Sequence, residues 1–373
     1  MSDSSSLVKN DTRSLRVIIV GGGIGGLSAA IALRRRGHEP LVLERAPKLD
    51  PVGAGITLFA NAMNALDRLG VAQAVAAAGA IVRHSAIRTS DGRQLTTLPA
   101  DLLEGAVAVH RGDLQTVLLE AAGEVRLGVE IEAVDQIDDE VVARSADGFE
   151  ERAQLLAEAD GLRSFVRGSV APSAPRYGSY TAWRGVSPVR VEPSHLTESW
   201  GVGERFGPVD IGSRTYWFAP ANVPEGETDE PTARKAELLR RFSDWHAPTA
   251  SVLRATPENA IVRNDGYFLK PLPRWSEGRI VLLGAAAHAT TPGIGQGAAQ
   301  ASRTPPYSRT SSPNRTSSGT LSPGTRRFAA HAPNPRSSSH AKPTEPPSSQ
   351  TQSPADCATP SSGAPRTASS AGN

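Results

Sequence analysis

The first apolar residues of the chain follow the order strand, helix, strand. Residues 17–20 are all β-branched, which is typical of a strand buried on both faces. Residues 27–36 have the composition of a helix with basic residues in its last turn, and Gly37 is placed to end it. A second apolar run, residues 40–43, ends at Glu44. The pattern therefore predicts two strands joined by a helix.

Later parts of the chain have different patterns. Residues 278–284 are a turn followed by a buried strand, and a glycine-bracketed loop at 291–297 then leads into a second helix. Upstream, aromatic and branched runs such as residues 214–218 alternate with Pro, Gly and Asn, which indicates a β-rich region. Residues 232–246 are the exception, because their apolar residues have helical spacing.

Residues 302–373 differ from everything before them. They contain one Leu, one Phe and one Tyr, no Val, Ile, Met or Trp, and 38 residues that are Ser, Thr or Pro. Such a segment buries too little apolar surface to offset the entropy of ordering it, so a disordered tail is predicted. The folded part is expected to be roughly residues 14–301.

Charge and cysteine content follow the same division. The tail has a net charge of +6 and the whole chain +2, which leaves residues 1–301 near −4. The basic balance therefore belongs to the tail, and no nucleic-acid partner is predicted. The only cysteine, Cys357, also lies in the tail, so the folded part has neither disulfides nor thiolate metal ligands, and no metal site is predicted. Residues 15–33, with Arg16 and five glycines, are not expected to span a membrane, and a cytoplasmic protein is expected.

A glycine motif lies between the first strand and the helix. Gly21, Gly23 and Gly26 match G-x-G-x-x-G, where the first permits a tight turn, the second lets the backbone approach a pyrophosphate and the third lets helix pack on strand. The phosphates would bind free N–H groups at the start of the helix. Glu44 is placed to accept hydrogen bonds from ribose hydroxyls, which favours FAD or NAD over NADP. The motif alone does not separate FAD from NAD.

Two further motifs favour a flavin. The segments at residues 21–26, 157–167 and 284–297, in this order and separation, resemble the three fingerprints of class A flavoprotein monooxygenases. This family includes salicylate, 3-hydroxybenzoate and urate hydroxylases and zeaxanthin epoxidase. Other stretches are similar to the family as well: 53–56, 61–62, 66–70, 110–115, 180–185, 216–219 and 271–275. The resemblance extends from about Arg16 to Ala301.

The resemblance implies an α/β fold like that of p-hydroxybenzoate hydroxylase. It would comprise a Rossmann-like FAD-binding domain made of residues 14–75, 105–172 and 274–301. A β-rich substrate domain, residues 76–104 and 173–273, would be inserted into it, and the tail, 302–373, would follow.

The resemblance also implies a set of cofactor-binding residues. Those expected to hold the adenosine diphosphate half of FAD are Gly21, Gly23, Ile24, Gly25, Gly26 and Glu44, with Arg45 and Arg111 near the pyrophosphate. Those expected further along the cofactor are Asp160 and Gly161, where flavin and nicotinamide both approach, then Ala285, Pro292, Gly295, Gln296 and Gly297. Arg184 and Tyr216 would face the substrate, although both residues could instead hold the sheet together. His288 belongs to the cofactor-loop motif, where a structural role is favoured, and no catalytic acid or base is assigned.

The chemistry implied is that of a single-component monooxygenase. NADH or NADPH reduces the flavin, O2 adds to give a C4a-hydroperoxide, and one oxygen atom hydroxylates or epoxidises a small aromatic or polyene substrate. The protein supplies binding, orientation and exclusion of water. Two alternatives stay open: another FAD-dependent oxidoreductase, such as an oxidase, dehydrogenase or halogenase, and a truncated, catalytically impaired relic of the monooxygenase. The sequence indicates neither the substrate nor the oligomeric state.

Two residues and the tail depart from the family pattern. Ala285 stands where the family has an Asp that accepts a hydrogen bond from the flavin ribityl chain, and Glu158 stands where a small residue is usual. After Ala301, plausible GC-rich codons for residues 302–330, read two bases out of frame, encode a family-like helix that begins Leu/Ile-Glu-Asp-Ala-Ala-Val-Leu-Ala. We therefore hypothesise a frameshift near codon 301, either real or a sequencing error. Resequencing tests it, and an open frame through Asn373 in several isolates would contradict it.

Overall fold

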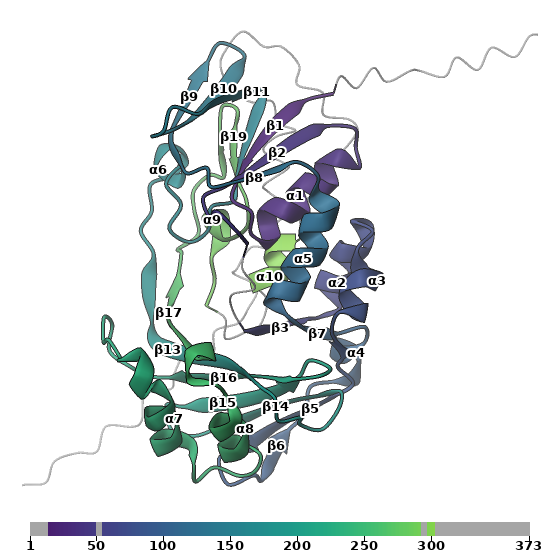
Figure 1. Ribbon diagram of the computed structural model, residues 1–373, viewed down its shortest axis with the longest axis vertical. Coiled ribbons are helices and arrows are strands. Elements are labelled where there is room, and N and C mark those ends of the chain that lie inside the picture. Colours follow the sequence, from purple (N-terminus) through teal and green to yellow (C-terminus); the bar gives the residue numbers. More distant parts are fainter. Residues whose placement is uncertain (1–13, 50–53, 292–296, 303–373) are drawn as a thin grey trace, which may run out of the picture. The chain divides into compact units, whose positions relative to one another are not determined.

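The computed structural model describes residues 14–49, 54–291 and 297–302. Its first layer is a six-stranded sheet with the strand order β18-β19-β12-β1-β2-β8 (Figure 1). All neighbours in this sheet are parallel except β18, which is antiparallel to β19. The strands are β1 Arg16–Val20, β2 Glu39–Glu44, β8 Val125–Leu127, β12 Leu155–Glu158, β18 Ser276–Glu277 and β19 Ile280–Leu282. The predicted Rossmann-like arrangement is confirmed.

The central strands of this sheet are buried on both faces because consecutive apolar residues, such as residues 17–20 and 41–43, point alternately to the two faces. Val17 and Ile19 of β1 pack into one core, together with α1 Ile24–Arg34 and α5 Arg111–Ala122. Ile18 and Val20 face the opposite core. That second core is covered by a three-stranded sheet, β9 Ile131–Ile137, β10 Glu140–Ser145 and β11 Glu150–Ala153, and by α6 Arg167–Val170. The predicted first helix is present but begins at Ile24, three residues earlier than its composition suggested.

A seven-stranded sheet, of order β17-β13-β16-β15-β14-β5-β6, forms the second large layer. Its strands are β5 His84–Thr89, β6 Gln94–Thr96, β13 Arg176–Ser187, β14 His195–Trp200, β15 Arg205–Asp210, β16 Thr215–Ala221 and β17 Val262–Phe268. One face packs on α7 Arg234–Phe242 and α8 Thr249–Ala255 around Phe206, Trp217 and Phe242 (Figure 1). The helical spacing noted in residues 232–246 therefore corresponds to α7. The division of the chain into two domains stays a prediction.

The other face of the seven-stranded sheet meets a small sheet of order β3-β7-β4. Tyr216 and Val209 of the large sheet share a buried core there with Ala54, Val82 and Ala108. The remaining elements are β3 Gly55–Leu58, β4 Ala80–Ile81, β7 Val107–His110, α2 Ala60–Arg68, α3 Ala72–Ala77, α4 Ala100–Leu103, η1 Pro231–Ala233, η2 Glu258–Ala260, α9 Gly284–His288 and α10 Gly297–Ser302. The described residues cover only part of this face, where Arg184 and Phe218 stay partly exposed.

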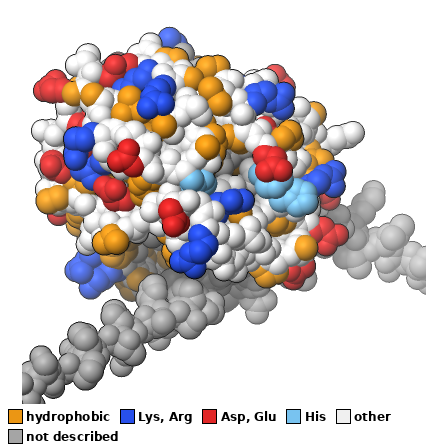
Figure 2. All heavy atoms as spheres, turned by 90° about the horizontal axis from the view of Figure 1, so that it is seen from below, with side chains coloured by type: hydrophobic (Ala, Val, Ile, Leu, Met, Phe, Trp, Pro, Cys, Tyr) orange, Lys and Arg blue, Asp and Glu red, His pale blue; other side chains and the backbone are white. Residues whose placement is uncertain are grey.

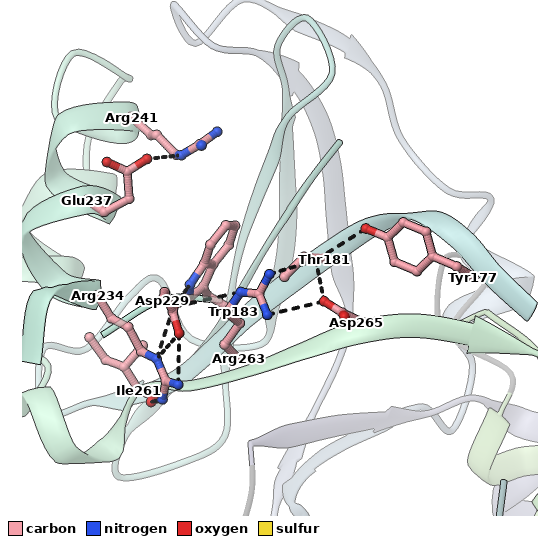
Figure 3. Close-up of polar contacts among 10 residues, drawn as sticks. All are labelled: Tyr177, Thr181, Trp183, Asp229, Arg234, Glu237, Arg241, Ile261, Arg263 and Asp265. Atoms are coloured by element: carbon pink, nitrogen blue, oxygen red, sulfur yellow. Dashed lines mark hydrogen bonds and ion pairs between the residues drawn. The ribbon is translucent and has the colours of Figure 1, made fainter. Parts of the chain in front are cut away.

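The helix-covered face of the large sheet is held by a polar network around Asp229 (Figure 3). Its carboxylate accepts hydrogen bonds from Arg234 at 3.0 Å and from the indole N–H of Trp183 at 3.1 Å, and lies 3.8 Å from Arg263. Arg263 also pairs with Asp265 at 3.3 Å. Burial alone would raise the pKa of Asp229, but the hydrogen bonds from Arg234 and Trp183 outweigh it and lower that pKa. One carboxylate thus joins β13, β17 and the start of α7.

Replacement of Asp229 by Ala is expected to destabilise the protein by about 2 kcal/mol, because Arg234 and the indole N–H of Trp183 lose their acceptor, and Arg263 loses an ion-pair partner, in a partly buried place. Urea unfolding measures the loss. The matched control is Glu124→Gln, which removes a carboxylate paired with Arg126 where both side chains are largely exposed. Such a surface pair contributes less than about 1 kcal/mol. Equal losses in the two variants would contradict a structural role for the network.

Among the described residues, no helix is long and apolar enough to cross a membrane. Figure 2 shows basic and acidic side chains interspersed over the face seen from below the view of Figure 1. The predicted tail, residues 302–373, lies outside the described residues except for Ser302, where α10 ends.

Candidate flavin site

The glycine turn between β1 and α1 is shaped by close backbone packing. Gly21 has a φ of +108°, and a Cβ there would lie 2.5 Å from the carbonyl oxygen of Ala159. A Cβ on Gly26 would overlap the carbonyl oxygen of Gly21. Gly23, in contrast, has no atom within 4 Å of its Cβ direction. Two glycines are therefore required by the fold, while Gly23 leaves open space in front of the turn, where a pyrophosphate could approach.

Glu44, at the end of β2, holds this turn in place. Its Oε2 accepts a hydrogen bond from the N–H of Gly22 at 2.6 Å, and its Oε1 accepts one from Ala46 at 2.9 Å. The side-chain amide of Gln115 donates to the carbonyl of Gly22 at 2.9 Å. Each carboxylate oxygen keeps a second lone pair, so a ribose hydroxyl could still bind. Glu44 thus has a structural function in addition to its predicted one. Gln115 supports the turn as well; it lies in the family-like stretch 110–115 but was not predicted as a site residue.

The Asp-Gly motif lies beside the glycine turn. Asp160 follows β12, the parallel neighbour of β1, and the Ala159 N–H donates to the carbonyl of Val20 at 2.8 Å. Oδ2 of Asp160 accepts from the N–H of Phe165 at 2.8 Å, which closes a turn containing Gly161. Gly161 has a φ of +94° and nothing within 4 Å of its Cβ direction. The turn therefore presents a second open backbone surface next to the first.

The third motif also reaches this place. Gly284, with a φ of +54°, follows β19, and its Cα lies 3.6 Å from where a Cβ on Gly25 would be. Ala285 is exposed at the start of α9. Gly297 begins α10, which packs against α1 and α2, and it too has open space around its Cβ direction. Pro292, Gly295 and Gln296 lie outside the described residues.

His288 lies at the end of α9. Its ring is 5.3 Å from that of Trp275, and burial lowers its pKa. A neutral ring packed on an indole agrees with the structural role that the sequence favoured, which stays a prediction.

The two predicted pyrophosphate arginines lie in different surroundings. Arg45 is 75% exposed, and its guanidinium is 3.8 Å from Glu130. Arg111 begins α5 and its side chain is exposed as a whole, but much protein surrounds its guanidinium. This partial desolvation, and then the charge of nearby Arg184 of β13, lower the pKa of Arg111. The structure therefore brings Arg111 towards the seven-stranded sheet, and Arg45 towards a surface acid.

Arg184 and Tyr216 are brought together on the incompletely covered face of the large sheet. Burial raises the pKa of Tyr216 to about 12, in spite of a side-chain hydrogen bond with Arg184 that acts in the opposite direction. Arg184 also donates to the side chain of Asn264 at 3.3 Å. Within the described residues, neither Arg184 nor Arg111 is paired with a carboxylate.

Aromatic rings surround Arg184 on this face, and each lies on a glycine of a neighbouring segment. The ring of Tyr180 lies on Gly266 of β17, and that of Phe218 lies on Gly207 of β15. The ring of Tyr216 lies against Gly55 in the same way. We call these three rings the aromatic floor. Tyr180 and Phe218 were not singled out from the sequence as site residues, because their positions depend on glycines in strands that are distant along the chain.

These elements place three open glycine segments next to one another and an aromatic floor on the facing sheet. A family profile described as "FAD binding domain" matches residues 14–302. The chain belongs to this family. The predicted class, a class A flavoprotein monooxygenase that uses FAD with NAD(P)H as co-substrate, is confirmed.

Several members of this family are similar over most of their length. The chain is 47% identical over 298 residues to aurachin C monooxygenase/isomerase of Stigmatella aurantiaca, covering 77% of this chain and 78% of the relative. It is 37% identical over 299 residues to 2-heptyl-3-hydroxy-4(1H)-quinolone synthase of Pseudomonas aeruginosa, again covering 77% and 78%. The crystal structure of Klebsiella pneumoniae HpxO with FAD and uric acid superposes with a TM-score of 0.73 at 29% identity, covering 78% of this chain and 77% of that one.

The described residues of this flavoprotein fit the cofactor. Gly23, Gly161 and Gly297 are far apart along the sequence, but each has open space in its Cβ direction. A side chain at any of the three positions would occupy that space. Ala285 supplies no hydrogen-bonding side chain. The predicted cofactor residues are therefore proposed, not observed, contacts of FAD.

Proposed function

We propose that this flavoprotein monooxygenase inserts one oxygen atom of O2 into a flat, electron-rich aromatic ring that lies on the aromatic floor. The observation that carries the proposal is the position of Arg184 among the partly exposed rings of Tyr180 and Phe218 and beside the buried ring of Tyr216. Ring-on-ring contacts favour planar aromatic ligands by about 0.5–1.5 kcal/mol each beyond their buried area. A polyene substrate would gain less from this surface.

Arg184 would recognise an oxygen of the substrate. Its guanidinium has no carboxylate partner in the described part of the chain, and Arg111 lies near it. Two cations in protein-rich surroundings repel each other unless a ligand or cofactor supplies negative charge. We infer that a carbonyl, phenolate or carboxylate oxygen of the substrate lies at Arg184, while Arg111 is shared with the cofactor.

FAD, reduced by the nicotinamide and reacting with O2, supplies the oxygen transfer when bound. The residues of the chain bind and orient the cofactor and the substrate. The glycine segments at Gly23, Gly161 and Gly297 would receive the cofactor, Arg184 would fix the substrate ring, and the floor would exclude water from the reacting ring. No side chain is assigned a proton-transfer step.

The name of the Pseudomonas relative suggests a probe. Its product is a 3-hydroxylated 4-quinolone, so we propose a 4-quinolone or similar bicyclic ring as the substrate class. A purified yellow protein that consumes NADH or NADPH faster with 2-heptyl-4(1H)-quinolone, and forms a product carrying oxygen from isotopically labelled O2, would support the function. NAD(P)H consumption that yields only hydrogen peroxide with every aromatic probe would contradict it. We also propose a cytoplasmic location, where reduced nicotinamide is supplied.

Replacement of Arg184 by Met is expected to raise the KM for the substrate by roughly 10- to 150-fold while FAD is retained, because one charge-assisted hydrogen bond is worth about 1.5–3 kcal/mol. Steady-state kinetics and the flavin absorption spectrum measure the two effects. Arg254→Met, at an exposed position of α8, is the control and should leave KM unchanged. If the Arg184 variant lost flavin but kept the wild-type KM in its flavin-loaded fraction, Arg184 would bind the cofactor and not the substrate.

A further inference from the structure

A fully buried carboxyl group and a partly buried one lie close together where the parallel sheet meets the Asp-Gly turn. Glu158, the last residue of β12, is fully buried, and its Oε1 accepts a hydrogen bond from the N–H of Asp160 at 3.2 Å. The side chains of Glu158 and Asp160 are close enough to hydrogen-bond to each other. Yet Oε2 of Glu158 and Oδ1 of Asp160 are both buried with no partner among the described groups.

A single proton would satisfy both oxygens. Two carboxylates can only repel, whereas a carboxylic acid donates to its neighbour. Burial raises the pKa of Glu158 well above its ordinary value, and Asp160 raises it further. Asp160 accepts a hydrogen bond from the Phe165 N–H through its other oxygen, so its Oδ1 is the oxygen left to accept one from Glu158.

The charge of the surroundings agrees with one proton. Arg167, on α6, is 3% exposed, and among the described residues its guanidinium donates only to the backbone carbonyls of Leu162, Ser173 and Ala286. Asp160 and Glu158 are the charged groups that act on it through space. One negative charge shared by the two carboxyls balances this buried cation, whereas two would leave an excess negative charge beside the place where the cofactor's phosphates are proposed to lie.

We propose that Glu158 is protonated, shares its proton with Asp160, and so holds the turn at residues 160–161 in the shape that receives FAD. Glu158 is then a positioning residue that acts through Asp160. The part concerning FAD rests on the proposed function. The shared proton does not.

The pH dependence follows from the raised pKa of Glu158. A carboxyl whose pKa is higher in the folded than in the unfolded protein stabilises the fold fully below the unfolded value, about 4.3, and this contribution is lost as pH rises through the folded value. FAD binding should share the trend, because an ionised Glu158 repels Asp160 and adds negative charge near the phosphates.

The test compares Glu158→Gln with the wild-type full chain. The amide keeps the shape and can donate to Asp160, but it does not ionise. FAD affinity, measured by quenching of flavin fluorescence between about pH 6 and pH 10, should weaken for the wild type by up to about tenfold per pH unit above the pKa of Glu158 in the FAD-free protein. The affinity of Glu158→Gln should stay level. The same pH dependence of FAD affinity in the wild type and in Glu158→Gln would overturn the proposal.

Two further measurements keep the outcomes apart. Glu158→Ala leaves Oδ1 of Asp160 unpaired and should bind FAD at least tenfold more weakly than Glu158→Gln at pH 7; equal affinity would overturn the positioning role. If Glu158→Ala does not fold, the comparison of Glu158→Gln with the wild type tests the proposal by itself. Glu151→Gln, whose carboxylate pairs with Arg16 at 2.7 Å on the far end of β1, is the control and should keep the wild-type pH profile.

The FAD-free protein gives an independent readout. The infrared carbonyl band of a buried neutral carboxylic acid should be present in the wild type at pH 7 and missing in Glu158→Gln. Its absence from the wild type would overturn the shared proton. A colourless protein that binds no FAD but shows this band would contradict the proposed function and leave the proton in place.

Discussion

A protein in which Gly26 is replaced by Ala is expected to be recovered colourless and destabilised by about 3 kcal/mol or more. The new Cβ would overlap the carbonyl oxygen of Gly21, which is backbone and has no other rotamer to adopt. The turn or α1 would have to shift, and forced shifts in close-packed regions typically cost 1–3 kcal/mol, occasionally more. Denaturant unfolding and the flavin absorption spectrum measure the two effects.

Gly23→Ala separates binding from folding at the same turn. Its Cβ meets nothing within 4 Å, so this variant should unfold like the wild type and yet bind FAD at least a hundredfold more weakly, because the methyl group occupies the approach of the pyrophosphate. Gly168→Ala, which also meets nothing within 4 Å but lies on α6, should change neither property. If Gly23→Ala retained full FAD affinity, the cofactor would have to lie elsewhere.

Replacement of Ala285 by Asp is expected to tighten FAD binding by roughly ten- to a hundredfold. Ala285 is exposed at the start of α9, next to the three glycine segments, and a carboxylate there could accept a hydrogen bond worth about 1.5–3 kcal/mol. A negative charge in the first turn of a helix adds a few tenths of a kcal/mol. Titration of FAD-free protein followed by flavin fluorescence measures the gain.

Ala285→Asn is the matched control for this gain, because it has the size of Asp and an acceptor oxygen but no charge. It should recover a smaller part of the affinity. If Asp and Asn bind FAD no more tightly than Ala, the missing carboxylate is not what limits cofactor retention in this chain.

The cofactor half of the fold could be predicted because its determinants are local. A β-branched run, a glycine turn and a terminal acid all lie within residues 17–44, and the glycine turn is required by a close backbone approach, as at Gly26. The meeting of the glycine turn with Asp160 was expected from the family resemblance rather than from spacing. It arises because β12 is the parallel neighbour of β1.

The substrate side was less predictable because it depends on strand register. Phe218 lies on Gly207 only because β15 and β16 pair those two residues directly. Arg184 was proposed as a site residue from resemblance, whereas Tyr180 and Phe218 lay in family-like stretches but were not proposed as site residues. The contacts of two cofactor-motif side chains were not predicted either. Glu44 accepts a hydrogen bond from the neighbouring glycine turn, and Arg45 extends towards Glu130.

Adjacent residues of β13 have different functions, because successive side chains of a strand point to opposite faces of the sheet. Trp183 contributes to the network around Asp229, while Arg184 and Tyr180 look out on the accessible face. Substitutions at the outward positions can therefore alter which ring is accepted without loosening the packing beneath α7. Related proteins with this strand can therefore differ in substrate while the packing of the sheet on its helices is kept.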